Sequence, residues 1–203
     1  MRIRYLLVLL LALPLWVRAE PVILVVGDSI SAGFGIPVQQ GWVALLEQTL
    51  QQDVPSLSVV NASISGDTTS GGLNRLPALL AGHKPALTLI ELGGNDGLRG
   101  QPLARIRNNL QRMITLCHEA GSDVILLGMQ IPPNYGPRYT EGFRDLYGEA
   151  AADAGTPLLP FLLQDIATRP ALMQADGIHP TAEAQPIMTQ AVLPLVMKWL
   201  NDR

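Results

Sequence analysis

Short apolar runs alternate with longer amphipathic stretches along most of this chain. Five runs have the length of strands and are bounded by Gly, Pro, Asn or Asp, namely 22–26, 57–60, 87–92, 124–129 and a weaker run at 157–159. Between them, apolar residues recur at helical spacing, and a final helical stretch at about 183–200 is interrupted by Pro186 and Pro194. Continuous apolar strands alternating with helices are typical of a parallel sheet covered on both faces. The pattern predicts an α/β fold, a flavodoxin-like three-layer α/β/α sandwich with about five strands.

The N-terminal residues have the pattern of a secretory signal peptide. Two arginines precede the apolar stretch 5–13, and small residues occupy the minus-three and minus-one positions of a cleavage site after Ala19. The apolar stretch is shorter than the roughly 20 residues that a membrane span requires. We therefore predict a signal peptide at 1–19 and export to the periplasm or the medium, with an uncleaved anchor as the alternative.

The remaining residues, 20–203, have a length that suits a single domain. Three of the 14 basic residues lie in the predicted signal peptide, which leaves 11 against 17 acidic residues, a net charge of −6 with His neutral. Because nucleic-acid binding needs a concentrated basic face, it is not expected. Cys117 is the single cysteine, so no intramolecular disulfide can form, and we expect it in the core on a helix. We predict a monomer that needs no metal and no cofactor, although no pattern sets the oligomeric state.

Three polar blocks suggest nucleophilic catalysis. Gly27-Asp28-Ser29-Ile30 directly follows the first apolar run and places a hydroxyl at the end of a strand, where ligands gather in open α/β sheets. Asp176 precedes His179 by three residues in a Gly- and Pro-containing loop, and Asn95 follows the third apolar run. A serine nucleophile needs a base and donors for the oxyanion, and these residues can supply both. Each block taken alone is also compatible with an ordinary turn.

The other two histidines are predicted to be structural. His83 lies in a sequence that is typical of a helix end. His118 lies late in an amphipathic helix, where the helix dipole favours a side chain that can carry positive charge. The order Ser, Asp, His is that of the α/β-hydrolases, but their Gly-x-Ser-x-Gly elbow is absent because Ser31 occupies the position of its second glycine.

Four blocks in order give this chain a resemblance to the SGNH (GDSL) hydrolases. They lie at 27–31, 61–69, 91–100 and 176–180, and they are most similar to the bacterial periplasmic members with esterase, thioesterase and lysophospholipase activity. The resemblance implies Ser29 as nucleophile, His179 as general base and Asp176 as its partner. It also implies an oxyanion hole of Ser29, Gly66 and Asn95. Ile30 stands where the family usually has Leu.

The neighbouring polar residues are expected to support this arrangement. The proposed oxyanion donors, which belong to Ser29, Gly66 and Asn95, come from three loops at one sheet edge. They can therefore converge on the carbonyl oxygen of a substrate. Asp28 and Asp96 are predicted to hold turns through backbone hydrogen bonds, and Thr68 and Thr69 to form the N-cap region of a helix.

The expected function is hydrolysis of small-molecule carboxylic esters and acyl thioesters through an acyl-enzyme. A carbohydrate O-deacetylase and a non-catalytic flavodoxin-like binding protein are the alternatives. Two segments are candidate walls of the substrate site. One consists of Gly97, Leu98, Arg99 and Gly100, as either a mobile loop over an acyl chain or a rigid turn. The other is the proline-rich segment 130–138, as either a wall or a surface connection.

Overall fold

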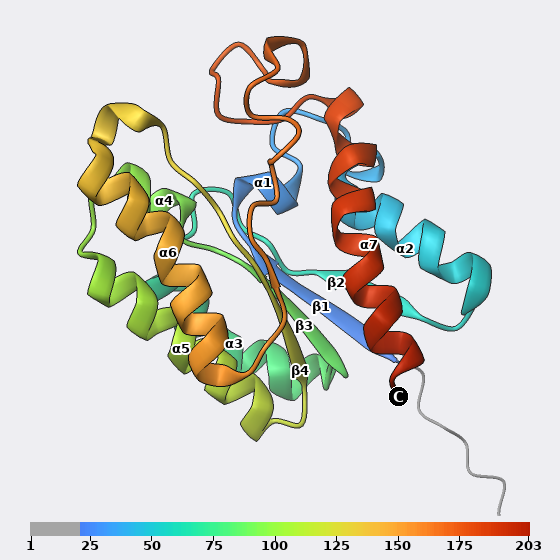
Figure 1. Ribbon diagram of the computed structural model, residues 1–203. Helices are drawn as coiled ribbons and strands as arrows, with labels where there is room; N and C mark the ends of the chain where they lie inside the picture. The colour runs from blue at the N-terminus through green and yellow to red at the C-terminus, as the bar shows by residue number, and fades with distance from the viewer. Residues whose placement is uncertain (1–20) are drawn as a thin grey trace, which may run out of the picture.

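The computed structural model describes residues 21–203, which Figure 1 traces from the first strand to the last helix. The predicted signal peptide and its cleavage point after Ala19 lie outside the described residues.

Five parallel strands form one sheet, as the apolar runs predict. The strands are β1 (Val22–Gly27), β2 (Ser58–Asn61), β3 (Leu87–Glu91), β4 (Asp123–Leu127) and β5 (Leu158–Leu159). Their order is β2-β1-β3-β4-β5, and every neighbouring pair is parallel. The strand order reverses between β1 and β3, and such a switch point is where open α/β sheets bind ligands.

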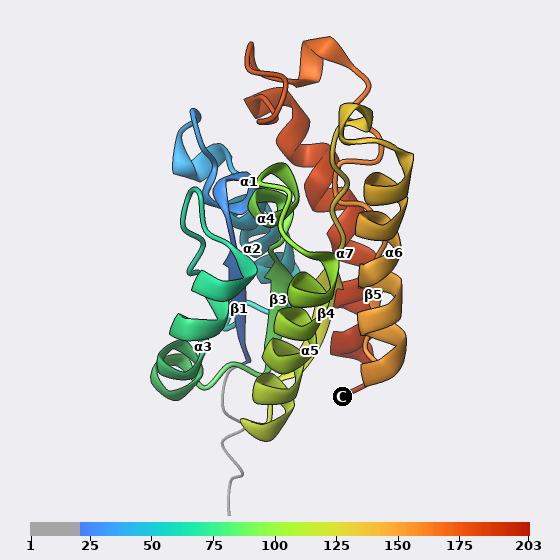
Figure 2. The ribbon, with the colours of Figure 1, turned by 90° about the vertical axis from the view of Figure 1, so that its left-hand side faces the viewer.

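Helices cover both faces of this sheet, which confirms the predicted three-layer sandwich. The α-helices are α1 (Ser29–Ala32), α2 (Trp42–Asp53), α3 (Thr69–His83), α4 (Gly94–Leu98), α5 (Leu103–Glu119), α6 (Pro137–Ala154) and α7 (Gln185–Asn201). The short 3-10 helices are η1 (Val38–Gln40), η2 (Pro133–Tyr135), η3 (Pro170–Leu172) and η4 (Ala182–Ala184). Figures 1 and 2 show α3, α5 and α6 on one face of the sheet and α2 and α7 on the other.

The core lies between the sheet and its two helical layers. Residues 23–26 of β1 and Leu87, Leu89 and Ile90 of β3 have no exposed surface, as expected for strands covered on both faces. Cys117 is buried on α5, as predicted, and burial raises the pKa of its thiol to about 11.

The last helix differs from its prediction, because α7 continues through both prolines. Pro186 lies in the first turn, where the missing N–H would have had no helical partner. Pro194 lies inside the helix but at an exposed position, where water can reach the freed carbonyl group.

None of the helices within residues 21–203 combines the length and the apolar character that crossing a membrane requires.

Candidate active site

Ser29 begins α1 at the carboxyl end of β1. Asp28 is the N-cap of this short helix, its side chain accepting a hydrogen bond from the Ile30 N–H, and Gly33 ends the helix in the left-handed conformation. Gly27 is required here by space, since a Cβ would lie 2.8 Å from both the Ser31 hydroxyl and a Glu91 carboxyl oxygen. The strand therefore turns sharply and presents the Ser29 hydroxyl at the sheet edge.

The structure brings Ser29, His179 and Asp176 together in a chain of hydrogen bonds. The Ser29 Oγ lies 2.9 Å from His179 Nε2, and His179 Nδ1 lies 2.7 Å from Asp176 Oδ2. His83 and His118 lie in the last turns of α3 and α5 on exposed positions, as predicted. Only His179 among the three histidines has the contacts of a base for Ser29.

The loop that carries His179 is folded back on itself. Asp176 Oδ1 accepts hydrogen bonds from the N–H groups of Ile178 and His179, and Met173 pairs with Pro180 in an antiparallel bridge. Hydrogen bonds from the His179 side chain and from these two N–H groups lower the pKa of Asp176 to about 2. Asp176 is therefore ionised at neutral pH, which favours the Nδ1–H tautomer of His179 and leaves Nε2 free to accept the serine proton.

The predicted oxyanion donors lie on loops that are hydrogen-bonded to the Ser29 turn. The Ile64 N–H donates to the Gly27 carbonyl at 3.0 Å, which ties the loop carrying Gly66 to the end of β1. Asn95, on α4, donates its Nδ2 to Asp28 Oδ2 at 3.0 Å. Within residues 21–203, the backbone N–H groups of Ser29 and Gly66 donate to no other group.

Two further polar predictions can be compared with the structure. Thr68 is the N-cap of α3 and accepts from the Gly71 N–H, as predicted. Asp96 accepts a backbone hydrogen bond, but its partner is Thr69, the first residue of α3, whose N–H and hydroxyl both donate to the Asp96 carboxylate, so it does not hold its own turn.

The segment Gly97, Leu98, Arg99 and Gly100 forms the end of α4 and the turn after it. The half-buried Leu98 packs against the core, and its carbonyl accepts a hydrogen bond from the Tyr135 hydroxyl at 2.8 Å. Arg99 Nη2 donates to the Gly66 carbonyl at 3.3 Å. Tyr135 belongs to the proline-rich segment, so the two candidate walls contact each other.

The sequence did not predict three features of this region. Glu91 is completely buried below α1, and an acid at the end of an apolar strand is a signal that could have identified it. The Phe34 ring lies 4.4 Å from the His179 ring, centroid to centroid. Gln174 Nε2 donates to the carbonyls of Phe34 and Pro180. No sequence signal marks Phe34 or Gln174, because their roles depend on the loop conformation.

Two buried carboxyl groups lie directly beneath the Ser29 turn. Glu91 Oε2 accepts hydrogen bonds from the Ser31 hydroxyl at 2.7 Å and from the Asp28 N–H at 3.3 Å. Burial raises the pKa of Asp28 to about 6 and the pKa of Glu91 well above its ordinary value. Burial therefore favours the neutral form of Glu91.

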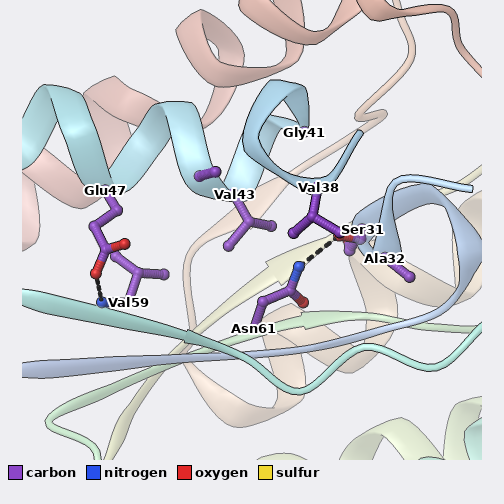
Figure 3. A pocket seen from close by; sticks show the side chains of 9 residues that line it. Ser31, Ala32, Val38, Gly41, Val43, Glu47, Val59 and Asn61 are labelled. Atoms are coloured by element: carbon purple, nitrogen blue, oxygen red, sulfur yellow. Dashed lines mark hydrogen bonds between the residues drawn. The ribbon is translucent and has the colours of Figure 1, made fainter. Parts of the chain in front are cut away.

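A cavity of about 180 Å³ lies beside α1, between η1, α2 and β2 (Figure 3). Its walls include Ser31, Val38, Val43 and Asn61, whose Nδ2 donates to the Ser31 carbonyl. None of the predicted catalytic residues lines it. Elsewhere in residues 21–203, no group of three His, Cys, Asp or Glu side chains has the geometry of a metal site.

Comparison with known proteins identifies the family. The model of the GDSL-like Lipase/Acylhydrolase family matches residues 25–186, most of the described chain. The chain belongs to this family and is an esterase.

Relatives of this GDSL-like hydrolase agree with that membership. It is 54% identical over 176 residues to Esterase TesA of Pseudomonas aeruginosa, covering 87% of this chain and 88% of the relative. It is 43% identical over 182 residues to Thioesterase 1/protease 1/lysophospholipase L1 of Escherichia coli, covering 88% and 86%. Among solved structures, the esterase EstA from Pseudoalteromonas sp., inhibited by monoethylphosphonate, is 40% identical with a TM-score of 0.85, covering 90% of this chain and all of the other.

Proposed function

We propose that this esterase hydrolyses carboxylic esters and acyl thioesters of fatty acids through an acyl-enzyme on Ser29. The observation that carries the proposal is the continuous hydrogen-bonded path from Ser29 Oγ through the His179 ring to the Asp176 carboxylate. A serine hydroxyl becomes a nucleophile when a neighbouring base can take its proton, and this path supplies the base and the group that orients it.

The proposed reaction has two halves. Ser29 Oγ bonds to the carbonyl carbon while its proton passes to His179 Nε2, and the N–H groups of Ser29 and Gly66 with the Asn95 amide stabilise the oxyanion. The tetrahedral intermediate then expels the alcohol or thiol, which takes the proton from His179. Water next attacks the acyl-enzyme, giving its proton to His179, and the Ser29 hydroxyl is restored as the acid leaves.

The substrate class is proposed from the relatives and from the walls of the site. One relative is named both a thioesterase and a lysophospholipase, and another an esterase. The half-buried Leu98 and the exposed Tyr135 offer apolar surface on the loops after Asn95. We propose that the segment 97–100, together with Tyr135, forms the wall for the acyl chain. We also propose that the protein is exported through the signal peptide at 1–19.

Covalent labelling and one substitution test the proposal. A serine-directed fluorophosphonate should add one adduct, and peptide mass spectrometry should locate it on Ser29. Ser29→Ala should reduce ester hydrolysis by at least about 10³-fold with an unchanged thermal midpoint, because it removes the only atom that forms the acyl bond. A labelled serine elsewhere, or a tenth of the wild-type turnover in Ser29→Ala, would overturn the assignment.

A substrate panel separates the proposed substrates from the alternatives. It should contain p-nitrophenyl esters from acetyl to palmitoyl, palmitoyl-CoA and acetylated xylo-oligosaccharides. Acyl esters and palmitoyl-CoA should be hydrolysed at rates that depend on chain length. Release of acetate from the sugars alone would identify a carbohydrate deacetylase.

A further inference from the structure

Asp28 contacts the nucleophile turn and the proposed oxyanion donor at the same time. Its Oδ1 accepts from the Ile30 N–H at 3.0 Å and so caps α1. Its Oδ2 accepts from Asn95 Nδ2 at 3.0 Å. The sequence prediction, a turn held through the backbone, accounts for the first of these contacts and leaves the second without a role.

The second contact is enclosed. Asp28 is 2% exposed, and a Cβ on Gly94 would approach Asp28 Oδ2 to 3.3 Å, closer than side chains normally pack. Because Gly94 has no side chain, the carboxylate can reach across to α4. The hydrogen bond between Asp28 and Asn95 therefore joins two loops that are 67 residues apart in the chain.

The chemistry of the two groups determines how the amide is oriented. A carboxylate only accepts hydrogen bonds, so it attracts the NH₂ group of Asn95 and repels the amide oxygen. Asn95 Nδ2 carries two hydrogens, and one of them is donated to Asp28 Oδ2. The other remains available for a second acceptor.

We propose that Asp28 is a positioning residue that holds the Asn95 amide with its nitrogen toward the oxyanion. This inference rests on the proposed role of Asn95 as an oxyanion donor. Asp28 itself does not touch the substrate, and it acts on the chemical step through Asn95. An amide turned the other way would present its oxygen lone pairs to a developing negative charge.

The competing explanation is that Asp28 serves only as the cap of α1. Asp28→Ser separates the two roles, because serine is as good an N-cap as aspartate but is too short to reach Asn95. Asp28→Asn gives a second test that keeps the side-chain volume. Its amide oxygen can cap Ile30, and its NH₂ group then faces Asn95 and favours the reversed amide.

The experiment is a double-mutant cycle in the full chain. Wild type, Asp28→Ser, Asn95→Ala and the double variant are assayed with p-nitrophenyl butyrate at pH 8, where Asp28 is ionised. Asp28→Ser should lower kcat by about 10- to 100-fold and leave KM within about twofold, as expected for a weakened oxyanion donor. In the Asn95→Ala background the same substitution should change kcat by less than about threefold, since the group that it positions is gone. Asp28→Asn should behave like Asp28→Ser in both backgrounds.

Each other outcome has a distinct meaning. Equal losses in both backgrounds, or a change in KM alone, would show that Asp28 acts independently of Asn95 and would overturn the inference. A wild-type kcat in Asn95→Ala would instead overturn the oxyanion assignment in the proposed function. Thermal midpoints of the four proteins check that the cap is retained. If Asp28→Ser does not fold, the cycle is run with Asp28→Asn, whose independence from Asn95 would equally overturn the inference.

Discussion

Ser29 rests on a floor of buried polar groups, whereas His179 is carried by a loop that solvent reaches. The floor consists of Asp28, Ser31 and Glu91, which are 2%, 2% and 0% exposed. The rim loop, residues 173–180, leaves the Asp176 side chain 39% exposed. The floor is built into the sheet edge, while the rim loop depends on hydrogen bonds within itself and on its contacts with Phe34.

This difference separates stability from catalysis. A buried polar group that loses its partner costs free energy of unfolding, whereas a half-exposed group can turn to water. Changes in the floor should therefore affect both folding and turnover. Changes in the rim loop should affect turnover with little effect on folding.

The largest expected effect in the rim loop is that of His179→Ala. It removes the proposed base, whose Nε2 lies 2.9 Å from Ser29 Oγ, so kcat should fall by at least about 10³-fold. The thermal midpoint should change little, because the neighbouring Asp176 carboxylate can be hydrated. Steady-state kinetics and a melting curve on the same preparation measure both quantities.

His83→Ala and His118→Ala are the matched controls for that substitution. Both side chains are exposed near helix ends, so each variant should keep kcat within about twofold of wild type. An inactive His118→Ala would show that the base has been misplaced.

In the floor, Glu91→Gln should change how stability depends on pH. Burial raises the pKa of Glu91 well above 4.5, so the folded state keeps a proton that the unfolded state releases above that pH. This stabilisation is complete below pH 4.5 and is lost as the pH rises toward the folded-state pKa. The difference in unfolding free energy, wild type minus variant, should fall by up to about 1.4 kcal/mol per pH unit between 4.5 and the folded-state pKa.

Urea unfolding at pH 5, 6, 7 and 8 measures that difference. Glu141→Gln, on an exposed position of α6, controls for the loss of one acidic side chain. Parallel pH profiles for wild type and Glu91→Gln would mean that Glu91 is already ionised in the folded protein.

Gln174→Ala should have a smaller effect in the rim loop. Its side chain donates to the carbonyls of Phe34 and Pro180, and each such hydrogen bond contributes about 1 kcal/mol. Without them the His179 ring is held less firmly, and kcat should fall about tenfold. Gln164→Ala is the control, since the exposed Gln164 side chain makes no hydrogen bond within residues 21–203. A lower thermal midpoint with unchanged kcat would show that Gln174 only braces the fold.

The sequence predicted the fold and the positions of Ser29, Asp176 and His179 better than it predicted the contacts that support them. The parallel sheet, its helical layers and the positions of Ser29 and His179 follow from apolar periodicity and strand-end turns, which are local features. Asp176 could be paired with His179 because His179 follows it by three positions in the sequence. Local spacing therefore predicted most of the hydrogen-bonded path from Ser29 to Asp176.

The supporting contacts could not be predicted in this way. The hydrogen bond from Asn95 to Asp28 joins α4 to α1, and Gln174 reaches a carbonyl 140 residues away. Such contacts depend on how close two loops come, which periodicity does not set. Pro194 shows the opposite kind of failure, because a local signal predicted a helix interruption that does not occur. A proline inside a helix is tolerated at an exposed position, such as that of Pro194 in α7.

The smallest expected effect concerns the Phe34 ring, which lies over His179 with an angle of 34° between the two planes. In the proposed mechanism His179 becomes a cation during each half-reaction, and an aromatic face stabilises a nearby cation by about 0.5–1 kcal/mol at an exposed site. Phe34→Leu removes that face and should lower kcat about two- to fivefold. Phe34→Tyr keeps the ring and should retain the wild-type kcat. Because Phe34 is 49% exposed, neither variant should shift the thermal midpoint. A rise in KM with unchanged kcat in Phe34→Leu would instead make Phe34 a substrate contact.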